Sequence, residues 1–470
     1  MDKDQEFAKP APEQKLFVGG HWLDGQEWFE VRDKLTGEVL AAVPTCEEEL
    51  LEMAVQASYD IQRSLAARSG EERAASLSAW AKQLGARRSL LARLLHREAA
   101  VPVRWADVEI EQAVAVLLAA ADEAARLEQE ASGTDPGSRL SLRRPVGSVA
   151  VLLPARQALF RAAQLCGAAI AAGCPVVLLA HPLTPLSVIG LVESAQAANF
   201  PPGTINLVFG LRRSISERLA GDPRVALLVT GGPAPDQEAL ASARGQRPRI
   251  QVGSGHGCAF LDRGADVASC VTALLARRFR NPRWAAGELA YVLCPEELTA
   301  RLHAALGEGA VSLPGGHREN PDDVVPWQLT ESAVRFATDW LDAITGMGGK
   351  VASGGRHSGL YVEPAVVTAP AGTRALPPPP AGAPFFVIDS YDKHPRAQLE
   401  RFPDITEMLI FTPDPKRALE LARLTDAERV DVIAPHSTGQ VSPGPVGAAD
   451  ISGLLAGMTR TTNVNLLYVP

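Results

Sequence analysis

Cysteine and histidine carry the widest chemistry in this chain, and their spacing limits the kinds of site that they could form. The 470 residues include six cysteines and nine histidines, and neither set shows the paired spacing of a metal site. Four of the cysteines lie among alanine, valine, leucine and glycine, where a free thiol behaves as a small apolar side chain. We therefore expect a reduced, metal-free protein in the cytoplasm. The six are Cys46, Cys166, Cys174, Cys258, Cys270 and Cys294.

A glycine-rich run at 253–257 could cradle a phosphate or, through Ser254 and His256, pair a nucleophile with a base. The run lacks the Lys-Ser/Thr that completes a P-loop, and a glycine-rich turn by itself is a weak signal. The short serine–histidine spacing is equally weak as an indication of a hydrolase. We interpret the run as a crossover between two domains.

Four arginines cluster shortly after this run, at Arg277, Arg278, Arg280 and Arg283. Such a cluster is typical of a solvated helix end or of a surface paired with acidic residues. The alternative is that these arginines join Arg156 around a pocket for an anion. Both interpretations remain open.

The elements that must position these residues follow from composition. Apolar residues make up 46% of the chain, which is enough for two domain cores at this length. The net charge of −8 argues against a nucleic-acid surface or an anionic membrane, and the first residues lack the apolar stretch of a signal peptide. The run 162–180 is nearly all apolar, but Gly173 and Pro175 interrupt it. We expect a buried helix followed by a buried strand there, and no membrane span.

Apolar spacing changes along the chain. Residues 47–130 have helical periodicity, and residues 148–250 alternate strand-like runs with helical stretches, which is typical of a parallel βαβ sheet. The alternation restarts over 251–370. The proline-rich segment 376–382 predicts an extended break at the surface. Residues 441–450 read as a loop before a final strand.

Several short segments, in a fixed order, carry a resemblance to a known family. They are 145–154, 171–179, 183–187, 200–208, 222–223, 230–231, 361–364 and 458–464. Over nearly the whole chain they resemble the NAD-dependent aldehyde dehydrogenases.

This resemblance implies an α/β fold of aldehyde dehydrogenase type, with a Rossmann-like cofactor domain at 1–130 and 146–250. It places a catalytic-type α/β domain at 251–450 and a small bridging sheet at 131–145 and 451–470. In the family the bridging strand pairs with a neighbouring subunit, so we expect an oligomer.

The family's nucleophile is a cysteine in Asn-x-Gly-Gln-x-Cys, whose thiolate attacks the aldehyde carbonyl. The matching segment 281–286 reads Asn-Pro-Arg-Trp-Ala-Ala and places Ala286 at that position. Alanine has no lone pair with which to attack. The alternative nucleophile is Cys294, although it follows the next strand and does not precede it.

Two further catalytic positions differ from the family. The general-base glutamate corresponds to Gln251, which lies 35 residues before Ala286 and has no titratable group. The asparagine amide that stabilises the developing alkoxide corresponds to Arg156, which is longer and charged. Gln157 could take that role if the loop shifts by one residue.

The cofactor contacts also differ. The lysine and glutamate that hold the adenosine ribose correspond to Leu179 and Pro182. The turn that holds the pyrophosphate contains Gly232 and ends at Pro235, and each proline there removes an N–H group. The glutamate that binds the nicotinamide ribose corresponds to Pro380. Drift toward a different cofactor would explain Leu179, but not the simultaneous loss of nucleophile, base and ribose contact.

Together these differences predict a catalytically inactive subunit that binds no nicotinamide cofactor, with NAD(P) binding as the alternative. The pattern resembles the non-catalytic half of the family 16 aldehyde dehydrogenases. That resemblance implies a structural partner for an active paralogue or for a second copy, joined through the bridging strand, with no nucleic acid and no membrane. Two other functions remain open: an active NAD(P)-dependent aldehyde oxidoreductase with a displaced nucleophile, and a ligand-binding module that uses the former cleft.

Overall fold

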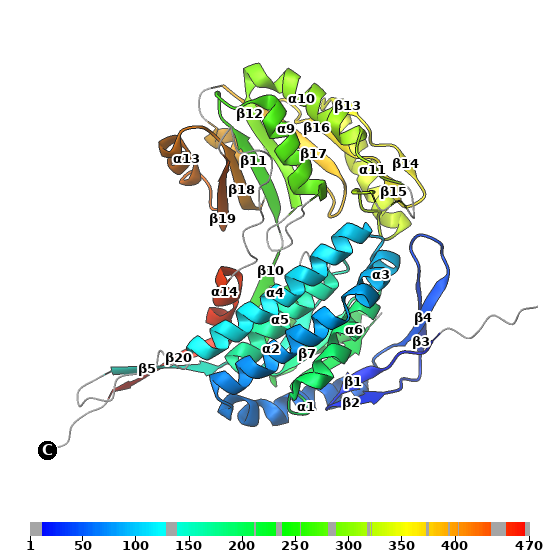
Figure 1. Ribbon diagram of the computed structural model, residues 1–470, viewed down its shortest axis with the longest axis vertical. Coiled ribbons are helices and arrows are strands. Elements are labelled where there is room, and N and C mark those ends of the chain that lie inside the picture. Colours follow the sequence, from blue (N-terminus) through cyan, green and yellow to red (C-terminus); the bar gives the residue numbers. More distant parts are fainter. Residues whose placement is uncertain are drawn as a thin grey trace, which may run out of the picture.

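The chain forms two α/β lobes, each built on a seven-stranded sheet, and a two-stranded ribbon that projects from the first lobe (Figure 1). This computed structural model describes residues 12–127, 139–210, 213–231, 237–253, 255–280, 288–316, 320, 322–372, 376–392, 395–402, 404–433 and 448–465. The expected α/β class with two sheets rich in parallel strands is confirmed.

The first sheet has the order β10-β9-β6-β7-β8-β1-β2. Its strands are β1 (Leu16–Val18), β2 (His21–Leu23), β6 (Ser148–Leu152), β7 (Val176–Ala180), β8 (Ile205–Phe209), β9 (Val225–Gly231) and β10 (Arg249–Val252). Strands β6 to β10 are parallel, whereas β1 runs antiparallel to β8. After β6 the chain builds outward through β7 and β8, then returns to place β9 on the other side of β6. This reversal leaves a crevice at the carboxyl ends of β6 and β9.

Helices surround this sheet. They are α1 (Glu48–Ala67), α2 (Gly70–Ala86), α3 (Arg88–Ala99), α4 (Val103–Leu127), α5 (Ala158–Ala172), α6 (Leu186–Ala195), the short η2 (Gln196–Ala198), α7 (Arg213–Gly221), α8 (Gln237–Arg244) and α14 (Ala448–Met458). The apolar run 162–180 forms α5 and β7, as predicted, and every residue of α5 is buried. Gly173 ends α5 at a φ of 86°, a left-handed conformation that suits glycine. Among the described helices, none is long and apolar enough to cross a membrane.

Two buried glutamates join the N-terminal helices to the helices of the first sheet. Glu98 of α3 accepts the N–H groups of Leu186 and Ser187, at 2.8 and 2.9 Å, at the start of α6. Glu109 of α4 accepts the N–H of Phe160 at 3.2 Å, at the start of α5. Burial raises the pKa of Glu98 to about 8 and that of Glu109 to about 7. These carboxyls satisfy N–H groups that a helix start leaves without intrahelical partners.

We expect Glu98 to make the stability of the chain depend on pH. Its pKa is raised from 4.5 to about 8 on folding, so the folded state binds more protons between these values. Its contribution is therefore complete at the lower pH and is lost as the pH rises toward 8. Relative to Glu98→Gln, the unfolding free energy of the wild type should fall by roughly 1 kcal/mol per pH unit across this interval. Denaturant unfolding of both proteins at several pH values measures this, and parallel curves would contradict it.

The second sheet has the order β13-β16-β17-β12-β11-β18-β19. Its strands are β11 (His256–Leu261), β12 (Glu288–Pro295), β13 (Val351–Ser353), β16 (Ala365–Thr368), β17 (Phe385–Tyr391), β18 (Ile405–Phe411) and β19 (Arg429–Ile433). Its helices are α9 (Val267–Leu275), the π-helical turn η3 (Ala276–Arg280), α10 (Glu296–Val311), α11 (Glu331–Gly346), α12 (Arg396–Leu399) and α13 (Pro415–Ala422). A short hairpin, β14 (His357–Ser358) with β15 (Tyr361–Val362), stands apart from this sheet.

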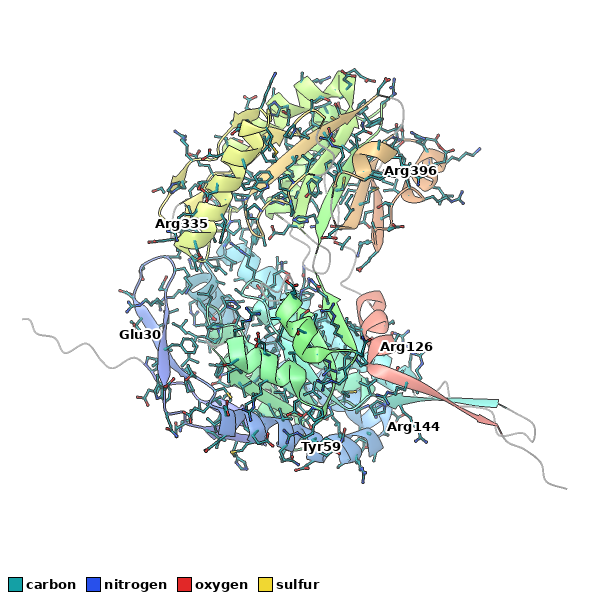
Figure 2. All side chains as sticks on the ribbon, turned by 180° about the vertical axis from the view of Figure 1, so that it is seen from behind. Glu30, Tyr59, Arg126, Arg144, Arg335 and Arg396 are labelled. Atoms are coloured by element: carbon teal, nitrogen blue, oxygen red, sulfur yellow. The ribbon has the colours of Figure 1, made fainter. Side chains whose placement is uncertain are left out.

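Two smaller strand pairs complete the fold. Strands β3 (Trp28–Arg32) and β4 (Val39–Pro44) form a hairpin whose tip residue Leu35 packs with Ala100 and Trp327, where the lobes meet. Strands β5 (Arg139–Pro145) and β20 (Thr459–Asn465) pair along their full length in the projecting ribbon. Figure 2 shows this ribbon leaving the body near Arg144.

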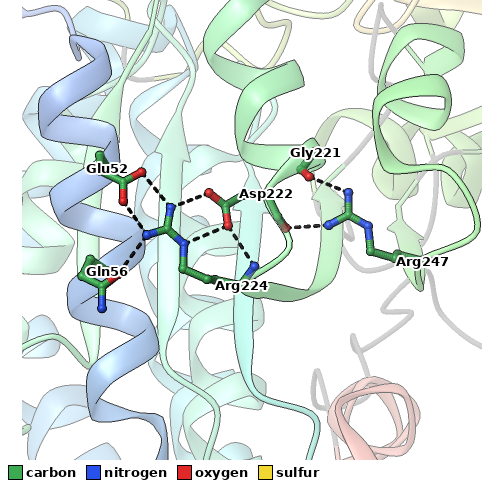
Figure 3. A network of polar contacts seen from close by, with 6 residues as sticks. All are labelled: Glu52, Gln56, Gly221, Asp222, Arg224 and Arg247. Carbon is green, nitrogen blue, oxygen red and sulfur yellow. Dashed lines mark hydrogen bonds and ion pairs between the residues drawn. The ribbon is translucent and has the colours of Figure 1, made fainter.

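The turn before β9 is held by an arginine network (Figure 3). Arg224 donates to the carboxylates of Asp222 and of Glu52 on α1, and also to the amide oxygen of Gln56. Arg247 donates to the backbone carbonyl oxygens of Gly221 and Asp222, both at 2.6 Å. The network therefore ties α1 to the end of α7 and fixes the entry of β9 into the sheet.

Candidate active site

A cleft of about 500 Å³ opens at the carboxyl ends of β6, β7 and β9, in the crevice that the strand order creates. The apolar walls of this cleft come from Leu152, Leu179 and Leu183, and Pro182 also lines it. The volume lies within the range of small-molecule sites. The first lobe therefore keeps a cleft at the position where open α/β sheets bind nucleotides.

The polar groups of this cleft suit a dinucleotide. The lining includes His181, Arg213, Ser216 and Thr230, and these imidazole, guanidinium and hydroxyl groups match the hydroxyls and phosphates of such a cofactor. Burial, together with Lys34, lowers the pKa of His181 to about 4, so its ring is neutral near pH 7. Nδ1 of His181 accepts the N–H of Leu183 at 3.1 Å, which places the ring proton on Nε2. His181 thus keeps one donor for a ligand.

A second, smaller cavity of about 50 Å³ lies between the lobes. Its lining brings together Trp105 and Glu109 from α4, Arg278 from η3 and Glu288 from β12. Trp105 also joins the lobes directly, because its Nε1 donates to the carbonyl oxygen of Phe279 at 2.8 Å. Arg156 lines both this cavity and the cleft, so the two spaces adjoin at its side chain.

Arg156 is held at this junction by the second lobe. Its Nη2 donates to the carbonyl oxygen of Trp327 at 3.0 Å and to Oε1 of Gln328 at 3.3 Å. Gln328 in turn donates to the carbonyl oxygen of Gly382 at 2.8 Å. A Cβ atom added at Gly382 would lie 2.3 Å from Nε of Arg156, so the guanidinium occupies space that only glycine leaves. Burial lowers the pKa of Arg156, and the nearby carboxylate of Glu288 opposes that shift.

Glu288 and Arg278 form the charged wall opposite. Oε2 of Glu288 accepts the N–H of Gly382 at 3.0 Å and lies 3.9 Å from Nη2 of Arg278. Arg278 also donates to the carbonyl oxygens of Leu289 and Ala383, and its guanidinium lies over the ring of Phe386. These contacts fix both charges at the cavity.

The arginine cluster is therefore not a solvated helix end. Arg277 and Arg278 are 5% and 8% exposed. Both line the cavity, and Arg277 also pairs with the buried carboxylate of Glu407. The side chain of Arg280 and all of Arg283 lie outside the described residues. Arg156, Arg277 and Arg278 therefore line the cavity together with the carboxyl groups of Glu288 and Glu109.

The positions singled out in the sequence are only partly brought together. Arg156, Leu179 and Pro182 meet at the cleft, whereas Gln251 lies exposed on β10 and lines neither cavity. Pro380 lies beside the cleft, which the adjacent Ala381 lines. Ala286, Gly232, Pro235 and Ser254 lie outside the described residues.

The proline-rich segment 376–382 was expected to be a surface break, and this expectation is wrong at both ends. Leu376 is buried, and Gly382 lines the cavity between the lobes. Prolines lack an N–H group, so such a run can be enclosed while leaving few backbone donors to satisfy.

Sequence reasoning missed Glu288 and Arg213. Glu288 follows Ala286 by two residues and directly precedes the apolar run of β12, so its place at a strand start was a usable signal. Arg213 stands at the start of a helix that follows a buried strand, which is a common position for ligand contacts.

Cys294 is a core residue of the second lobe. Its Sγ lies 3.5 Å from Oγ1 of Thr299 and 3.8 Å from the carbonyl oxygen of Asp389. Burial raises the pKa of the thiol to about 11. Cys294 also lies six residues beyond Glu288 on β12, roughly 20 Å along an extended strand. All six cysteines are within the described residues and buried, and none lines either cavity.

Solved structures with the same fold include dehydrogenases. The NADP-dependent glyceraldehyde-3-phosphate dehydrogenase of Bacillus halodurans, solved with NADP, matches 97% of this chain and 99% of its own, at 23% identity and a TM-score of 0.84. The NAD-dependent aldehyde dehydrogenase of Sinorhizobium meliloti matches 100% of this chain and 98% of its own, at 19% identity and a TM-score of 0.86. At these identities the likeness establishes the fold.

Sequence relatives point to the same class. The mitochondrial succinate-semialdehyde dehydrogenase of Arabidopsis thaliana is 27% identical over 361 residues, which cover 74% of this chain and 68% of the relative. The human mitochondrial succinate-semialdehyde dehydrogenase is 30% identical over 272 residues, which cover 56% of this chain and 51% of the relative.

The predictions of an inactive subunit and of no nicotinamide cofactor are therefore wrong. The relatives are named as dehydrogenases, and the fold is shared with NAD- and NADP-dependent enzymes. The error lay in equating the replacements Ala286, Gln251 and Arg156 with loss of the reaction class. Hydride transfer needs a nucleotide cleft and a polarised substrate carbon, but not one particular nucleophile.

The resemblance seen in the short sequence segments extends through most of the chain. The model of the aldehyde dehydrogenase family matches residues 22–454, which include most of both lobes and the cleft at the carboxyl ends of β6 and β9. The chain belongs to the aldehyde dehydrogenase family.

Proposed function

We propose that this chain is an NAD(P)-dependent aldehyde oxidoreductase that acts on aldehydes bearing a carboxylate. The observation that carries the proposal is the position of Arg156, which lines both a nucleotide-sized cleft and a charged cavity between the lobes. A cofactor in the cleft and an aldehyde in the cavity would therefore meet at one buried cation.

The cleft residues His181, Arg213, Ser216 and Thr230 would hold the cofactor, because they supply donors for its hydroxyls and phosphates. The bound nicotinamide supplies the acceptor for a hydride.

The absence of a thiol from both cavities favours a route without a covalent enzyme intermediate. A hydrated aldehyde, R–CH(OH)₂, becomes the carboxylic acid when its carbon loses one hydride and one hydroxyl loses a proton. We assign this proton to Glu288, because it lies opposite the arginines and is held by the N–H of Gly382, whereas the other lining carboxyl, Glu109, accepts the N–H of Phe160 at the start of α5. Arg156 would stabilise the negative charge that develops on the hydrate oxygen.

The charge of the cavity supports the substrate class. Arg156 and Arg278 line it with Glu288 and Glu109, and burial raises the pKa of Glu109 to about 7, so that this carboxyl is only partly charged near neutral pH. Burial makes a cation without a full counter-charge costly. A substrate carboxylate would balance this charge. The relatives named succinate-semialdehyde dehydrogenases are named for such an aldehyde acid.

Turnover by the full chain tests the proposal. The purified protein is mixed with NAD⁺ or NADP⁺ and with succinate semialdehyde or uncharged aldehydes of similar length, and reduced nicotinamide and acid are both measured. We expect equal amounts of the two products and a higher kcat/KM for the carboxylated aldehyde. Cys294→Ala should keep the wild-type rate, which separates this route from attack by a thiol. If no aldehyde yields reduced nicotinamide or acid, the proposal is wrong.

We also propose that copies of the chain associate through the β5–β20 ribbon. A two-stranded ribbon is marginally stable by itself, and its open edges can pair with further strands. A solution mass equal to that of one chain would contradict this.

The six unpaired cysteines support a reducing compartment, which we propose to be the cytoplasm.

A further inference from the structure

The nucleotide cleft has an unusual balance of charge. Among the described residues that line it there is no aspartate or glutamate, whereas Arg156 and Arg213 are both present. Arg156 is held by Trp327 and Gln328 of the second lobe, at the end of the cleft that adjoins the substrate cavity. Arg213 is therefore the described arginine in the part of the cleft that only the first lobe lines.

Arg213 lies close to the end of β7. It begins α7, and Ser216 on the next turn lines the same cleft. The approach to α7 packs against that strand, because a Cβ atom added at Gly210 would lie 3.5 Å from Cδ1 of Leu179. Leu179 is thus a neighbour of the approach to α7, and Pro182 lines the same cleft. Neither side chain can accept a hydrogen bond.

The lack of a carboxylate among the described lining residues and the position of Arg213 affect how the cleft would recognise the ribose of a dinucleotide. A carboxylate that accepts from the 2′-hydroxyl selects NAD, and it repels a phosphate at that position. An arginine does the reverse, because its guanidinium donates charge-assisted hydrogen bonds to phosphate oxygens. The start of a helix adds partial positive charge from its N–H groups.

We infer that Arg213 selects cofactors that carry a 2′-phosphate, so that the chain prefers NADP(H) to NAD(H). This inference rests on the proposed function, since it specifies the cofactor of the same cleft. Nε of Arg213 donates to Oε1 of Glu217 at 2.5 Å, and Glu217 is not among the lining residues. The side chain of Arg213 is 57% exposed.

Binding of reduced cofactors to the full chain tests the inference without relying on turnover. The Kd values of NADPH and NADH are measured by fluorescence, for the wild type and for Arg213→Gln. We expect NADPH to bind at least about tenfold more tightly than NADH, and the substitution to remove about tenfold of that ratio. The Kd of NADH should change by less than about twofold, because NADH has no 2′-phosphate.

A matched control removes the same charge from the same helix. Arg218 pairs with Glu48 of α1 and does not line the cleft, so Arg218→Gln should leave the NADPH/NADH ratio unchanged. Arg213→Lys should restore part of the preference, since it keeps the charge but not the paired donors.

The outcomes separate the two proposals. If both cofactors bind with equal Kd, or if Arg213→Gln leaves the ratio as it was, the inference about Arg213 is overturned while the proposed function stands. If neither cofactor binds the wild type, the proposed function fails, and the inference fails with it.

Discussion

Replacing Glu288 with glutamine is expected to lower kcat by about 100-fold or more, because the hydrated aldehyde then loses its proton acceptor. Glutamine keeps the shape of the side chain and an oxygen that can accept the N–H of Gly382, so the cavity should stay assembled. The steady-state rate with succinate semialdehyde measures the effect. A primary deuterium isotope effect on the aldehydic position would show whether the chemical step has become slower.

Glu296→Gln is the matched control for Glu288. Glu296 is the next carboxylate along the chain, and it is exposed at the start of α10, away from both cavities. Its replacement should leave kcat unchanged. If Glu288→Gln retained a kcat within about twofold of the wild type, Glu288 would not be the proton acceptor.

Replacing Arg277 with methionine is expected to destabilise the fold by about 3–5 kcal/mol, because it leaves the carboxylate of Glu407 buried without its cation. Glu407 is 0% exposed on β18, and Arg277 reaches it from η3, the turn that also carries Arg278 to the cavity. Denaturant unfolding measures the change in free energy. We expect substrate binding to weaken as well, since η3 would lose a contact that fixes it.

A double variant tests the cause of this loss. With both Arg277 and Glu407 replaced by methionine, neither charge of this buried pair remains, and most of the lost stability should return. The exposed pair of Arg396 and Glu400 provides a contrast, because its removal should cost about 1 kcal/mol or less. If Arg277→Met alone cost under about 1 kcal/mol, the buried pair would not be the main constraint on η3.

The sequence identified the family and the general order of elements correctly, for local physical reasons. The run 162–180 indicated a helix and a strand because Gly173 and Pro175 interrupt its apolar residues. Such interruptions act on the local backbone, so they can be recognised without knowing the tertiary contacts. The cleft could also be placed near Leu179 and Pro182, since ligands bind at the carboxyl ends of parallel strands.

The functional interpretation failed where it compared single positions with the family. The mismatches at Gln251, Arg156 and Ala286 were taken one by one as losses. Gln251 in fact lines neither cavity, whereas Arg156 occupies the junction of both. A position-by-position comparison cannot show which groups have moved into a site from elsewhere, and Glu288 and Arg213 are such groups in our proposals.

Local residue patterns were enough to establish the family, the two α/β lobes and the strand ends where a nucleotide would bind, because apolar periodicity and turn residues act within a few positions. The charged cavity depended on the packing of the lobes. Arg156, Glu288 and Gly382 are each separated by more than 90 residues, yet Gly382 contacts both of the others. Only the packed chain sets which charges are buried together, because burial and short-range hydrogen bonds depend on distance in space and not on distance along the sequence.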